Sequence, residues 1–134
     1  MGSEMCIRDR FLLHARYGDL NWSSLLQPAE RFARDGHTLS RAFVRDFNAS
    51  QAVMSFDQEA VEIFGNGKVV EGSLVRQVEL GAIISNLRTR GPGDFYDGSI
   101  GRLFVESVSS VGGKITIADL REYRPVLQLS LIHI

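Results

Sequence analysis

Few residues in this sequence are of the types that carry out chemistry, and their spacing does not bring them together. His14 and His37 lie far apart, and neither has a second His or a Cys at the spacing of metal ligands. Isolated histidines of this kind are typical of surface and helix-capping positions. We therefore expect surface or capping roles for both and no metal-binding site.

Two glycine-lysine sequences resemble part of a phosphate-binding loop but lack its required residues. Gly113–Lys114 is followed by Ile115, where such a loop needs Ser or Thr, and Val108 stands in place of its first glycine. Residues 65–68, Gly-Asn-Gly-Lys, fail in the same way, and a tight turn is the expected structure there. The sequence therefore predicts no nucleotide-binding or cofactor-binding loop.

The remaining polar and aromatic candidates fit structural roles better than catalytic ones. Asp94, Asp97 and Asp119 fall at turns and helix starts, where aspartate accepts hydrogen bonds from backbone amides. Phe95–Tyr96 could stack on a ligand, but aromatic pairs at helix junctions more often anchor a small core. Serines without a nearby base in the sequence, which give no positive sign of a catalytic triad, are Ser23, Ser24, Ser109 and Ser110. We expect no catalytic residue, cofactor or metal in this chain.

Composition narrows the class of protein further. The chain has 134 residues and a mass of 14.9 kDa, which is enough for one domain. Its 15 Lys and Arg residues face 16 Asp and Glu residues, so no surplus of positive charge favours a nucleic-acid backbone or an anionic membrane. The single cysteine, Cys6, excludes an internal disulfide. No apolar run approaches the ~20 residues needed to cross a bilayer.

The two ends of the chain differ in pattern from the sequence between them. Residues 129–134 read Leu-Ser-Leu-Ile-His-Ile, and DNA that encodes them has a reverse complement that encodes Met-Cys-Ile-Arg-Asp, the sequence of residues 5–9. One transposase adapter from sequencing-library preparation, inverted at the two ends, would produce both segments. A natural leader is the alternative, but the start lacks the longer apolar segment of a signal peptide. We therefore interpret residues 1–10 and 129–134 as translated adapter, and residues 11–128 as an interior piece of a longer protein.

Apolar residues spaced three and four apart predict amphipathic helices through most of the native stretch. Residues 11–17 form the end of one helix, with Gly18 as its stop. The next helix has Asn21 as its N-cap and Gly36 as its left-handed closing residue. Pro28 should kink this helix because it removes one backbone donor. Its apolar face consists of Trp22, Leu25, Leu26, Ala29, Phe32 and Ala33.

The middle of the chain predicts two shorter helices. Ser40 caps a helix that ends near Asn48, and residues 55–58 have the form of a capping box for a short helix through Phe64. Residues 65–70 predict a turn followed by at most a brief extended segment. The expected buried face of the first of these helices is formed by Phe43, Val44 and Phe47.

Three further helices are expected in the last part of the chain. One runs from about Gln77 to the Gly-Pro-Gly sequence at residues 91–93, and the next follows a turn at Asp97–Gly98 and ends at Gly112–Gly113. Their apolar faces are formed by Leu80, Ile83, Ile84 and Leu87, and by Ile100, Leu103, Phe104, Val108 and Val111.

The last helix is short and should be capped by Thr116, with Asp119 in its first turn. Leu120 and Tyr123 would lie on its inner side, and Pro125 would end it. Beyond it, Val126–Leu127 leads towards a strand. The sequence as a whole predicts a mainly α fold with little paired strand of its own.

An ordered set of short motifs in the last part of the chain resembles the gamma-glutamyltranspeptidase family. Residues 95–98, Phe-Tyr-Asp-Gly, resemble its Phe-Tyr-x-Gly turn, and residues 112–116 resemble its Gly-Gly-x-Leu/Ile-Thr element. Asp119–Leu120 with Tyr123 resembles its Asp-Leu-x-x-Tyr helix.

The upstream sequence agrees with this resemblance. Residues 28–40 look like the family's Pro-Ala helix and the turn after it, and Gln77 begins a segment like its Gln-x-x-Leu-Ala helix. Gly81 stands where the family usually has Ala, which weakens the helix by about 1 kcal/mol. Residues 48–70 match loosely, in a region where members vary in length. The resemblance covers nearly all of residues 11–128.

The resemblance implies an αββα N-terminal nucleophile hydrolase, made as a proenzyme that cleaves itself into a large and a small subunit. A Thr at the start of the small subunit would attack the gamma-glutamyl amide of glutathione or a related compound, with its own α-amino group as base. Water or an acceptor amino acid would then receive the glutamyl group. Family members are commonly exported, which implies a periplasmic or secreted parent protein.

No catalytic residue is carried over to this chain by matching positions. The chain resembles the middle of the large subunit, upstream of the nucleophilic Thr and downstream of the family's substrate-binding Arg. We therefore expect a scaffold whose partners are the remaining large subunit and the small subunit, with a glutathione-like substrate only in the full-length parent. An acylase of the same superfamily and a non-enzymatic helical binding module are the alternatives. Helix faces that pack on a missing sheet should stay exposed and promote aggregation.

Overall fold

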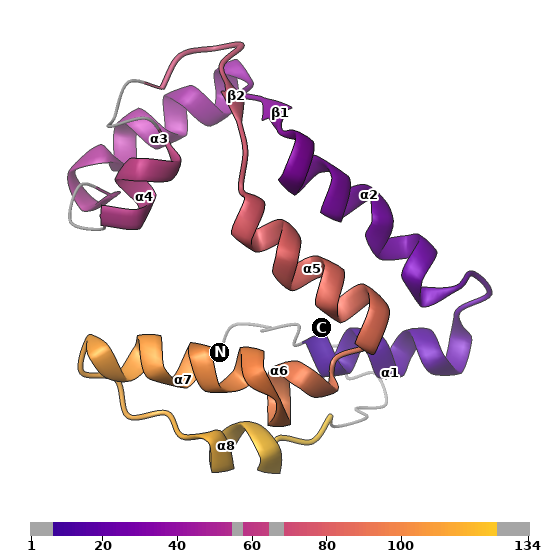
Figure 1. Ribbon diagram of the computed structural model, residues 1–134. Coiled ribbons are helices and arrows are strands. Elements are labelled where there is room, and N and C mark those ends of the chain that lie inside the picture. The colour runs from indigo at the N-terminus through magenta and orange to yellow at the C-terminus, as the bar shows by residue number, and fades with distance from the viewer. Residues whose placement is uncertain (1–6, 55–57, 65–68, 126–134) are drawn as a thin grey trace, which may run out of the picture. The chain divides into compact units, whose positions relative to one another are not determined.

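Helices dominate the computed structural model, which describes residues 7–54, 58–64 and 69–125 (Figure 1). By their contacts, residues 1–25 and 86–134 form one compact unit, and residues 26–85 form a second. The helices are α1 (Ile7–Tyr17), α2 (Trp22–Asp35), α3 (Arg41–Met54), α4 (Gln58–Ile63), α5 (Val78–Arg90), α6 (Gly93–Asp97), α7 (Ser99–Ser110) and α8 (Ile117–Glu122). The strands are β1 (His37–Thr38) and β2 (Leu74–Val75). The predicted mainly α fold is confirmed.

The ends of α2 follow from local sequence signals, as predicted. The side chain of Asn21 accepts a hydrogen bond from the amide of Ser23 at 2.9 Å, which satisfies one of the free donors at the start of the helix. At the other end, Gly36 has a φ of 94°, a left-handed conformation that costs glycine no steric penalty. The helix continues through Pro28 without interruption.

The first helix ends as predicted, and α3 is longer than predicted. Helix α1 begins at Ile7, inside the segment that we interpret as adapter, and the amide of Gly18 closes it on the carbonyl of His14 at 2.7 Å. The hydroxyl of Ser40 caps α3 through the amide of Phe43, as expected. The predicted end of α3 near Asn48 is wrong, because the helix continues to Met54 through residues such as Ala49 and Ala52 that favour helix. The predicted capping residues 55–57 lie outside the described residues.

A short antiparallel strand pair lies in the unit of residues 26–85. Thr38 pairs with Leu74 and His37 pairs with Val75. The amide of Leu39 donates to the carbonyl of Ser73 at 2.9 Å, which extends the ladder beyond the strands. The sequence predicted an extended segment at residues 68–70 instead. Within that stretch, Val69 and Val70 are described and belong to no strand.

The core of this unit forms where the strand pair meets α3. Its buried residues are Leu39, Phe47, Val69 and Val75, with Val44 and Phe64 packed against them. Phe43, which we expected to be buried, is 36% exposed, so this part of the predicted face is wrong. Its ring packs on those of Phe47 and Phe64 at 6.0 and 5.6 Å, on the outer side of the cluster.

Within the same unit, the end of α2 lies beside the start of α5. Gly81 is buried, and a Cβ atom there would lie 2.6 Å from Cγ of Arg34. This close approach explains why a glycine in the middle of a helix is useful at this position. The predicted apolar face of α5 is only partly covered, since Leu87 is buried whereas Leu80 and Ile83 are 43% and 39% exposed.

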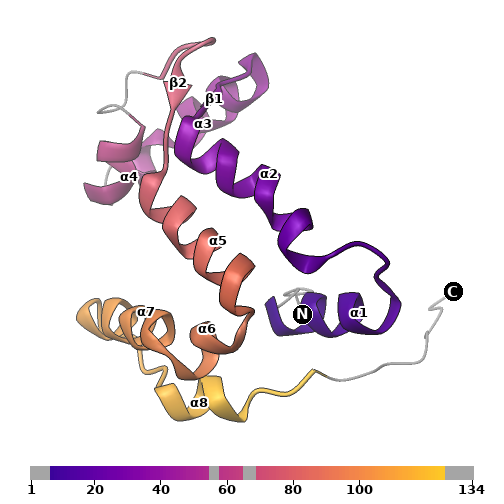
Figure 2. The ribbon, with the colours of Figure 1, turned by 45° about the vertical axis from the view of Figure 1, so that its right-hand side comes forward.

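In the other unit, α6, α7 and α8 pack together (Figures 1 and 2). In both views α8 runs beneath α6 and α7, and the buried side chains of Tyr96 and Leu120 come from α6 and α8. Helix α6 was not predicted, because five residues between Gly93 and Asp97 are too few to show a helical period. Among the helices of the described residues, none has both the length and the apolar character needed to cross a bilayer.

Candidate functional site

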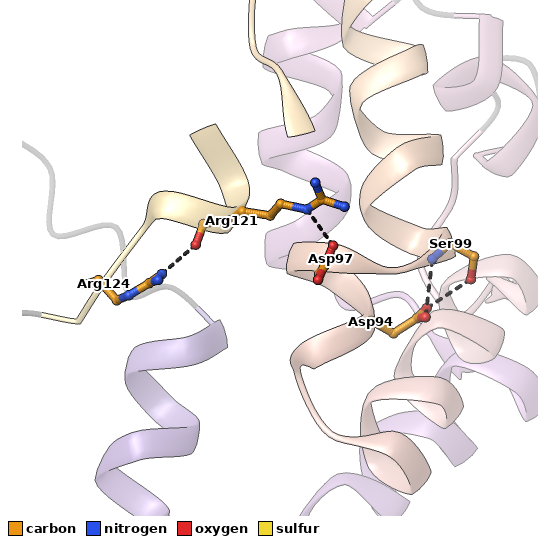
Figure 3. Close-up of polar contacts among 5 residues, drawn as sticks. All are labelled: Asp94, Asp97, Ser99, Arg121 and Arg124. Atoms are coloured by element: carbon orange, nitrogen blue, oxygen red, sulfur yellow. Dashed lines mark hydrogen bonds and ion pairs between the residues drawn. The ribbon is translucent and has the colours of Figure 1, made fainter. Parts of the chain in front are cut away.

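The motif residues of the sequence analysis meet at the junction of α6, α7 and α8. Asp94 of α6 lies at the start of α7 and accepts three hydrogen bonds there (Figure 3). Its donors are the amide of Ser99 at 3.2 Å, the hydroxyl of Ser99 at 3.0 Å and the amide of Ile100 at 3.3 Å. Gly98, at the N-cap position, has no side chain to offer. Asp94 therefore caps α7 from within the preceding helix.

Gly98 leaves the space that Asp94 occupies. A Cβ atom on Gly98 would lie 2.0 Å from Oδ1 and 2.7 Å from Cα of Asp94. The φ of Gly98 is −109°, which any residue can adopt, so the requirement here is room for the cap. Glycine is therefore required at the last position of the Phe-Tyr-Asp-Gly sequence because a side chain there would clash with Asp94.

The aromatic residues of the same motif form a small core. Tyr96 is 3% exposed, and its ring packs edge-on against Phe95 at 5.2 Å and parallel to Tyr123 at 6.0 Å. Phe95 also contacts the ring of Phe104 on α7 at 5.5 Å. The interpretation of Phe95–Tyr96 as core anchors is confirmed.

Close backbone packing joins α6 to α7. Gly101 is buried, and a Cβ atom there would lie 2.4 Å from the carbonyl oxygen of Phe95. A backbone atom cannot move aside as a flexible side chain can, so only glycine fits at this crossing.

Thr116 and Asp119 cap α8 reciprocally. The hydroxyl oxygen of Thr116 accepts from the amide of Asp119 at 3.2 Å, and the carboxylate of Asp119 accepts from the amide of Thr116 at 2.8 Å. The Thr116 hydroxyl also lies 2.6 Å from the carboxylate. This is a complete capping box, in which both partners satisfy free backbone donors. The expected cap by Thr116 is confirmed. Asp119 lies in the first turn as predicted, and its carboxylate also accepts a hydrogen bond from the Thr116 amide.

Two carboxyl groups at these caps are held in their charged form. Burial raises the pKa of Asp94, but hydrogen bonds from Ile100 and Ser99, together with the charge of Arg90, outweigh it and lower the pKa from its ordinary value of 3.8. The hydroxyl and amide of Thr116 lower the pKa of Asp119 in the same direction. Both groups are therefore ionised hydrogen-bond acceptors at neutral pH and have no proton to donate to a reaction.

Asp97 lies at the surface beside α8. Its carboxylate contacts Nε of Arg121 at 2.5 Å, and Arg124 donates to the carbonyl of Arg121 at 2.5 Å (Figure 3). Both side chains of the Asp97–Arg121 pair are more than half exposed, where ion pairs contribute little to stability.

Two histidines and one serine from the sequence analysis lie at the surface or make contacts typical of structural residues. His14 places Nε2 2.7 Å from the carbonyl oxygen of Leu20, and His37 is exposed on β1. The hydroxyl of Ser23 accepts a hydrogen bond from Arg88 at 3.0 Å. Within residues 7–54, 58–64 and 69–125, no group of three or more His, Cys, Asp or Glu residues could hold a metal ion.

Gly113–Lys114 belongs to the end of α7 and not to a phosphate-binding loop. The amide of Gly113 donates to the carbonyl of Val108 at 2.8 Å, and that of Gly112 donates to Ser109 at 3.0 Å. These bonds satisfy the last carbonyls of the helix. The second glycine-lysine sequence, at residues 65–68, lies outside the described residues.

A groove in the unit of residues 26–85 has a volume of about 510 Å³. It is lined by Glu62, Ile63, Arg76, Gln77, Val78, Glu79, Leu80 and Ile83. None of these described lining residues is a Ser, Thr, Cys, His or Lys whose side chain could act as a nucleophile. Three of the groove's apolar residues, Val78, Leu80 and Ile83, lie on the incompletely covered α5, and the fourth, Ile63, is the last residue of α4.

Sequence reasoning predicted that Asp94 accepts backbone amides at a turn or helix start, but it did not identify these amides, which are those of Ser99 and Ile100. The contacts of Arg8 and Asp9 with Tyr96 and Tyr123 have no local signal, because they join the two ends of the chain.

Comparison with known proteins places this geometry in a family. The sequence model of gamma-glutamyltranspeptidase matches residues 7–133. Glutathione hydrolase 2 of Arabidopsis thaliana is 32% identical over 110 residues, which are 81% of this chain and 19% of that protein. The glutathione hydrolase proenzyme of Pseudomonas aeruginosa is 29% identical over 119 residues, which are 83% of this chain and 20% of that protein. The match extends into both end segments, whose origin as adapter stays a prediction.

Solved structures agree. Gamma-glutamyltranspeptidase from Pseudomonas nitroreducens, complexed with L-DON, has a TM-score of 0.79 and 28% identity over 88% of this chain and 35% of its own. The Helicobacter pylori gamma-glutamyltranspeptidase has a TM-score of 0.79 and 25% identity over 84% of this chain and 33% of its own. The chain thus spans about a fifth of the length of the curated relatives. On the match of the family model to nearly its whole length, the chain belongs to the gamma-glutamyltranspeptidase family.

Proposed function

We propose that residues 11–128 are a scaffold segment in the large subunit of a gamma-glutamyltransferase or glutathione hydrolase proenzyme, and that this segment is inactive alone. The parent would transfer the gamma-glutamyl group of glutathione, or of a related amide, to water or an amino-acid acceptor through an N-terminal Thr outside this segment. The observation that carries this proposal is the match of nearly the whole chain to about a fifth of the length of glutathione hydrolases.

The polar groups of the motif cluster support a scaffold role. Asp94 and Asp119 are occupied with the amides and hydroxyls of helix starts. A general acid or base must exchange a proton with a substrate, and the lowered pKa values of these two carboxyls work against that use. The cluster is therefore suited to hold α6, α7 and α8 together.

The exposed apolar residues support the proposed partners. Leu80 and Ile83 line a groove on α5, and Leu103 and Phe104 of α7 are 63% and 38% exposed. Exposed apolar faces of this kind are typical of surfaces that another part of a protein covers. Members of the family are processed into a large and a small subunit. We propose that the remaining large subunit and the small subunit cover these faces.

A chimeric enzyme tests this proposal. Residues 11–128 would replace the matching segment of the Pseudomonas nitroreducens gamma-glutamyltranspeptidase. We expect the chimera to cleave into two subunits and to release glutamate from glutathione, and the isolated chain to release none. The same chimera with Gly101→Ala is the control, because the methyl group should push α6 and α7 apart and lower the yield of cleaved enzyme.

Two results would contradict the proposal. Glutamate release by the isolated chain would reveal a nucleophile within it. A folded chimera that does not cleave itself would show that the segment does more than support the fold. Extension of the reading frame past Gln128 separates the alternatives, since a downstream Thr at a cleavage site fits the proenzyme and an early stop codon fits a helical binding module.

A further inference from the structure

Two asparagines begin an Asn-x-Ser sequence, the acceptor sequence for N-linked oligosaccharides in secreted proteins. Asn21 begins Asn-Trp-Ser, and Asn48 begins Asn-Ala-Ser. Both asparagines lie within the stretch that we interpret as native, and both are exposed. The structure distinguishes these two acceptor sequences by their local conformation.

Asn21 lies in the corner between α1 and α2, directly before the first residue of α2. Its Oδ1 accepts the amide of Ser23 at 2.9 Å, which is the bond from residue i+2 to residue i of an Asx turn. Because this bond involves only residues 21–23, it can form as soon as they are synthesised. It uses Oδ1, whereas a glycan is attached to Nδ2 of the same carboxamide.

The middle residue of this acceptor sequence is turned away from Asn21 and into the fold. The ring of Trp22 packs edge-on against that of Phe11 at 5.1 Å, and its Nε1 donates to the carbonyl of Leu87 at 2.9 Å. Asn21 itself stays exposed. A glycan on Asn21 therefore leaves the packing of Trp22 in place.

The hydroxyl of the acceptor sequence is bound only late in folding. Ser23 accepts a hydrogen bond from Arg88 at 3.0 Å, and these residues are 65 positions apart in the sequence. During synthesis the N-terminal part of a chain emerges first, so Ser23 enters the lumen before Arg88 has been made. The hydroxyl is then available to the transferase.

Asn48 has a different setting, because it lies inside α3. Residues two positions apart in a helix do not face each other, so the Asn48 carboxamide and the Ser50 hydroxyl lie on different sides of α3. Within a helix the amide of Ser50 also bonds to the carbonyl four residues earlier. An Asx turn at Asn48 would require α3 to open.

We propose that Asn21 is an N-glycosylation site and that Asn48 is not. The donor is an oligosaccharide joined to a lipid through pyrophosphate in a secretory lumen. Nδ2 of Asn21 bonds to the anomeric carbon and loses one proton, while the bond from that carbon to the pyrophosphate oxygen breaks and the lipid pyrophosphate leaves. The glycan would lie beside Leu20, which is 65% exposed, and would keep this corner in contact with water. The site does not depend on the proposed function.

Translation of the full chain with microsomes tests this site. The chain carries a cleavable signal peptide, and the microsomes supply the transferase and the lipid-linked donor. We expect a heavier product that peptide N-glycosidase returns to the unmodified size. Because this glycosidase leaves Asp at the modified position, mass spectrometry should find the conversion at residue 21 and not at residue 48.

Matched substitutions separate loss of the acceptor from loss of the fold. Asn21→Asp removes Nδ2 but keeps a side-chain oxygen to cap α2, and we expect the heavier product to be lost. Asn48→Asp is the control and should leave it unchanged. Ser23→Ala should also abolish the heavier product, whereas Ser23→Thr should retain it because the hydroxyl is kept.

The proposal is overturned if no product is sensitive to the glycosidase, or if Asn21→Asp still gives the same heavier product. Conversion of residue 48 to Asp would overturn the exclusion of the acceptor sequence in α3. A heavier product that persists in Ser23→Ala would also contradict the proposal, since the modification would then not depend on the acceptor sequence.

Discussion

Asp94 binds both the amide and the hydroxyl of Ser99 across the junction of α6 and α7, at 3.2 and 3.0 Å. The cap of one helix is thus a residue of the helix before it. Because Asp94 also accepts from Ile100, its carboxylate satisfies two free amides at the start of α7. The two helices are therefore coupled through a single side chain.

Loss of this cap should open α7. We expect Asp94→Ala to lower the free energy of opening of α7 by about 1–2 kcal/mol, the usual cost of removing a helix cap. Native-state hydrogen exchange of the α7 amides measures this change. Asp97→Ala is the control, since it removes only an exposed ion pair and should cost less than about 0.5 kcal/mol. Equal losses of opening free energy in the two variants would show that the Asp94 cap stabilises α7 no more than an exposed ion pair does.

The crossing of α6 and α7 should tolerate no side chain at Gly101. The Gly101→Ala methyl group would lie 2.4 Å from the carbonyl oxygen of Phe95, so we expect a loss of about 1–3 kcal/mol as the helices move apart. Gly93→Ala is the matched control, because nothing lies within 4 Å of a Cβ atom there. The free energy of α7 opening in the two variants is compared by a urea titration in which hydrogen exchange of the α7 amides is the readout. A neutral Gly101→Ala variant would contradict the described packing.

Acid should weaken the starts of α7 and α8. The folded state lowers the pKa values of Asp94 and Asp119 below 3.8, so the unfolded state binds more protons when the pH falls below about 4. The stabilisation is therefore complete above the unfolded pKa and is lost as the pH falls through the folded values. Asp119→Asn should remove the acid response of α8 in exchange measurements between pH 5 and 2. Asp19→Asn, outside these helices, should leave that response intact.

The groove on α5 should promote self-association of the isolated chain. Leu80 and Ile83 present apolar surface there, beside the exposed Val78. We expect Leu80→Lys with Ile83→Lys to shift the chain towards monomer in analytical ultracentrifugation at equal concentration. Leu103→Lys is the control, since Leu103 is exposed on α7 and is not one of the described residues that line the groove. If Leu103→Lys has the larger effect, the groove is not the main contact between chains.

Local signals in the sequence were enough to predict most helix ends. Asn21, Ser40 and Thr116 cap the helices they were expected to cap, and Gly36 closes α2 in a left-handed conformation. These features depend on neighbours within a few residues, so their chemistry is visible without the fold. The family motif at residues 95–98 was likewise visible, although the steric need for Gly98 was not.

Features set by distant contacts could not be predicted. Thr38 pairs with Leu74, but each strand has only two residues, too few to show the alternation of apolar and polar residues that identifies a strand. Phe43 and Leu80 have the spacing of buried residues and yet are exposed. A helical period identifies the apolar face of a helix, but it cannot say whether the covering surface is part of the same polypeptide. The docking of Arg8 on Tyr96 joins segments whose proximity only the fold creates.

The pairing of β1 with β2 also bears on how this part of the protein can evolve. The bonds from Leu39 to Ser73 and from Gly72 to Leu39 close a loop that contains α3 and α4. Because these hydrogen bonds join its two ends, the loop can become longer or shorter without moving the end of α2 or the start of α5. Each doubling of such a loop costs only about 0.6 kcal/mol of closure entropy. Insertions and deletions should therefore accumulate between Leu39 and Ser73, where a lineage can add new surface at small thermodynamic cost.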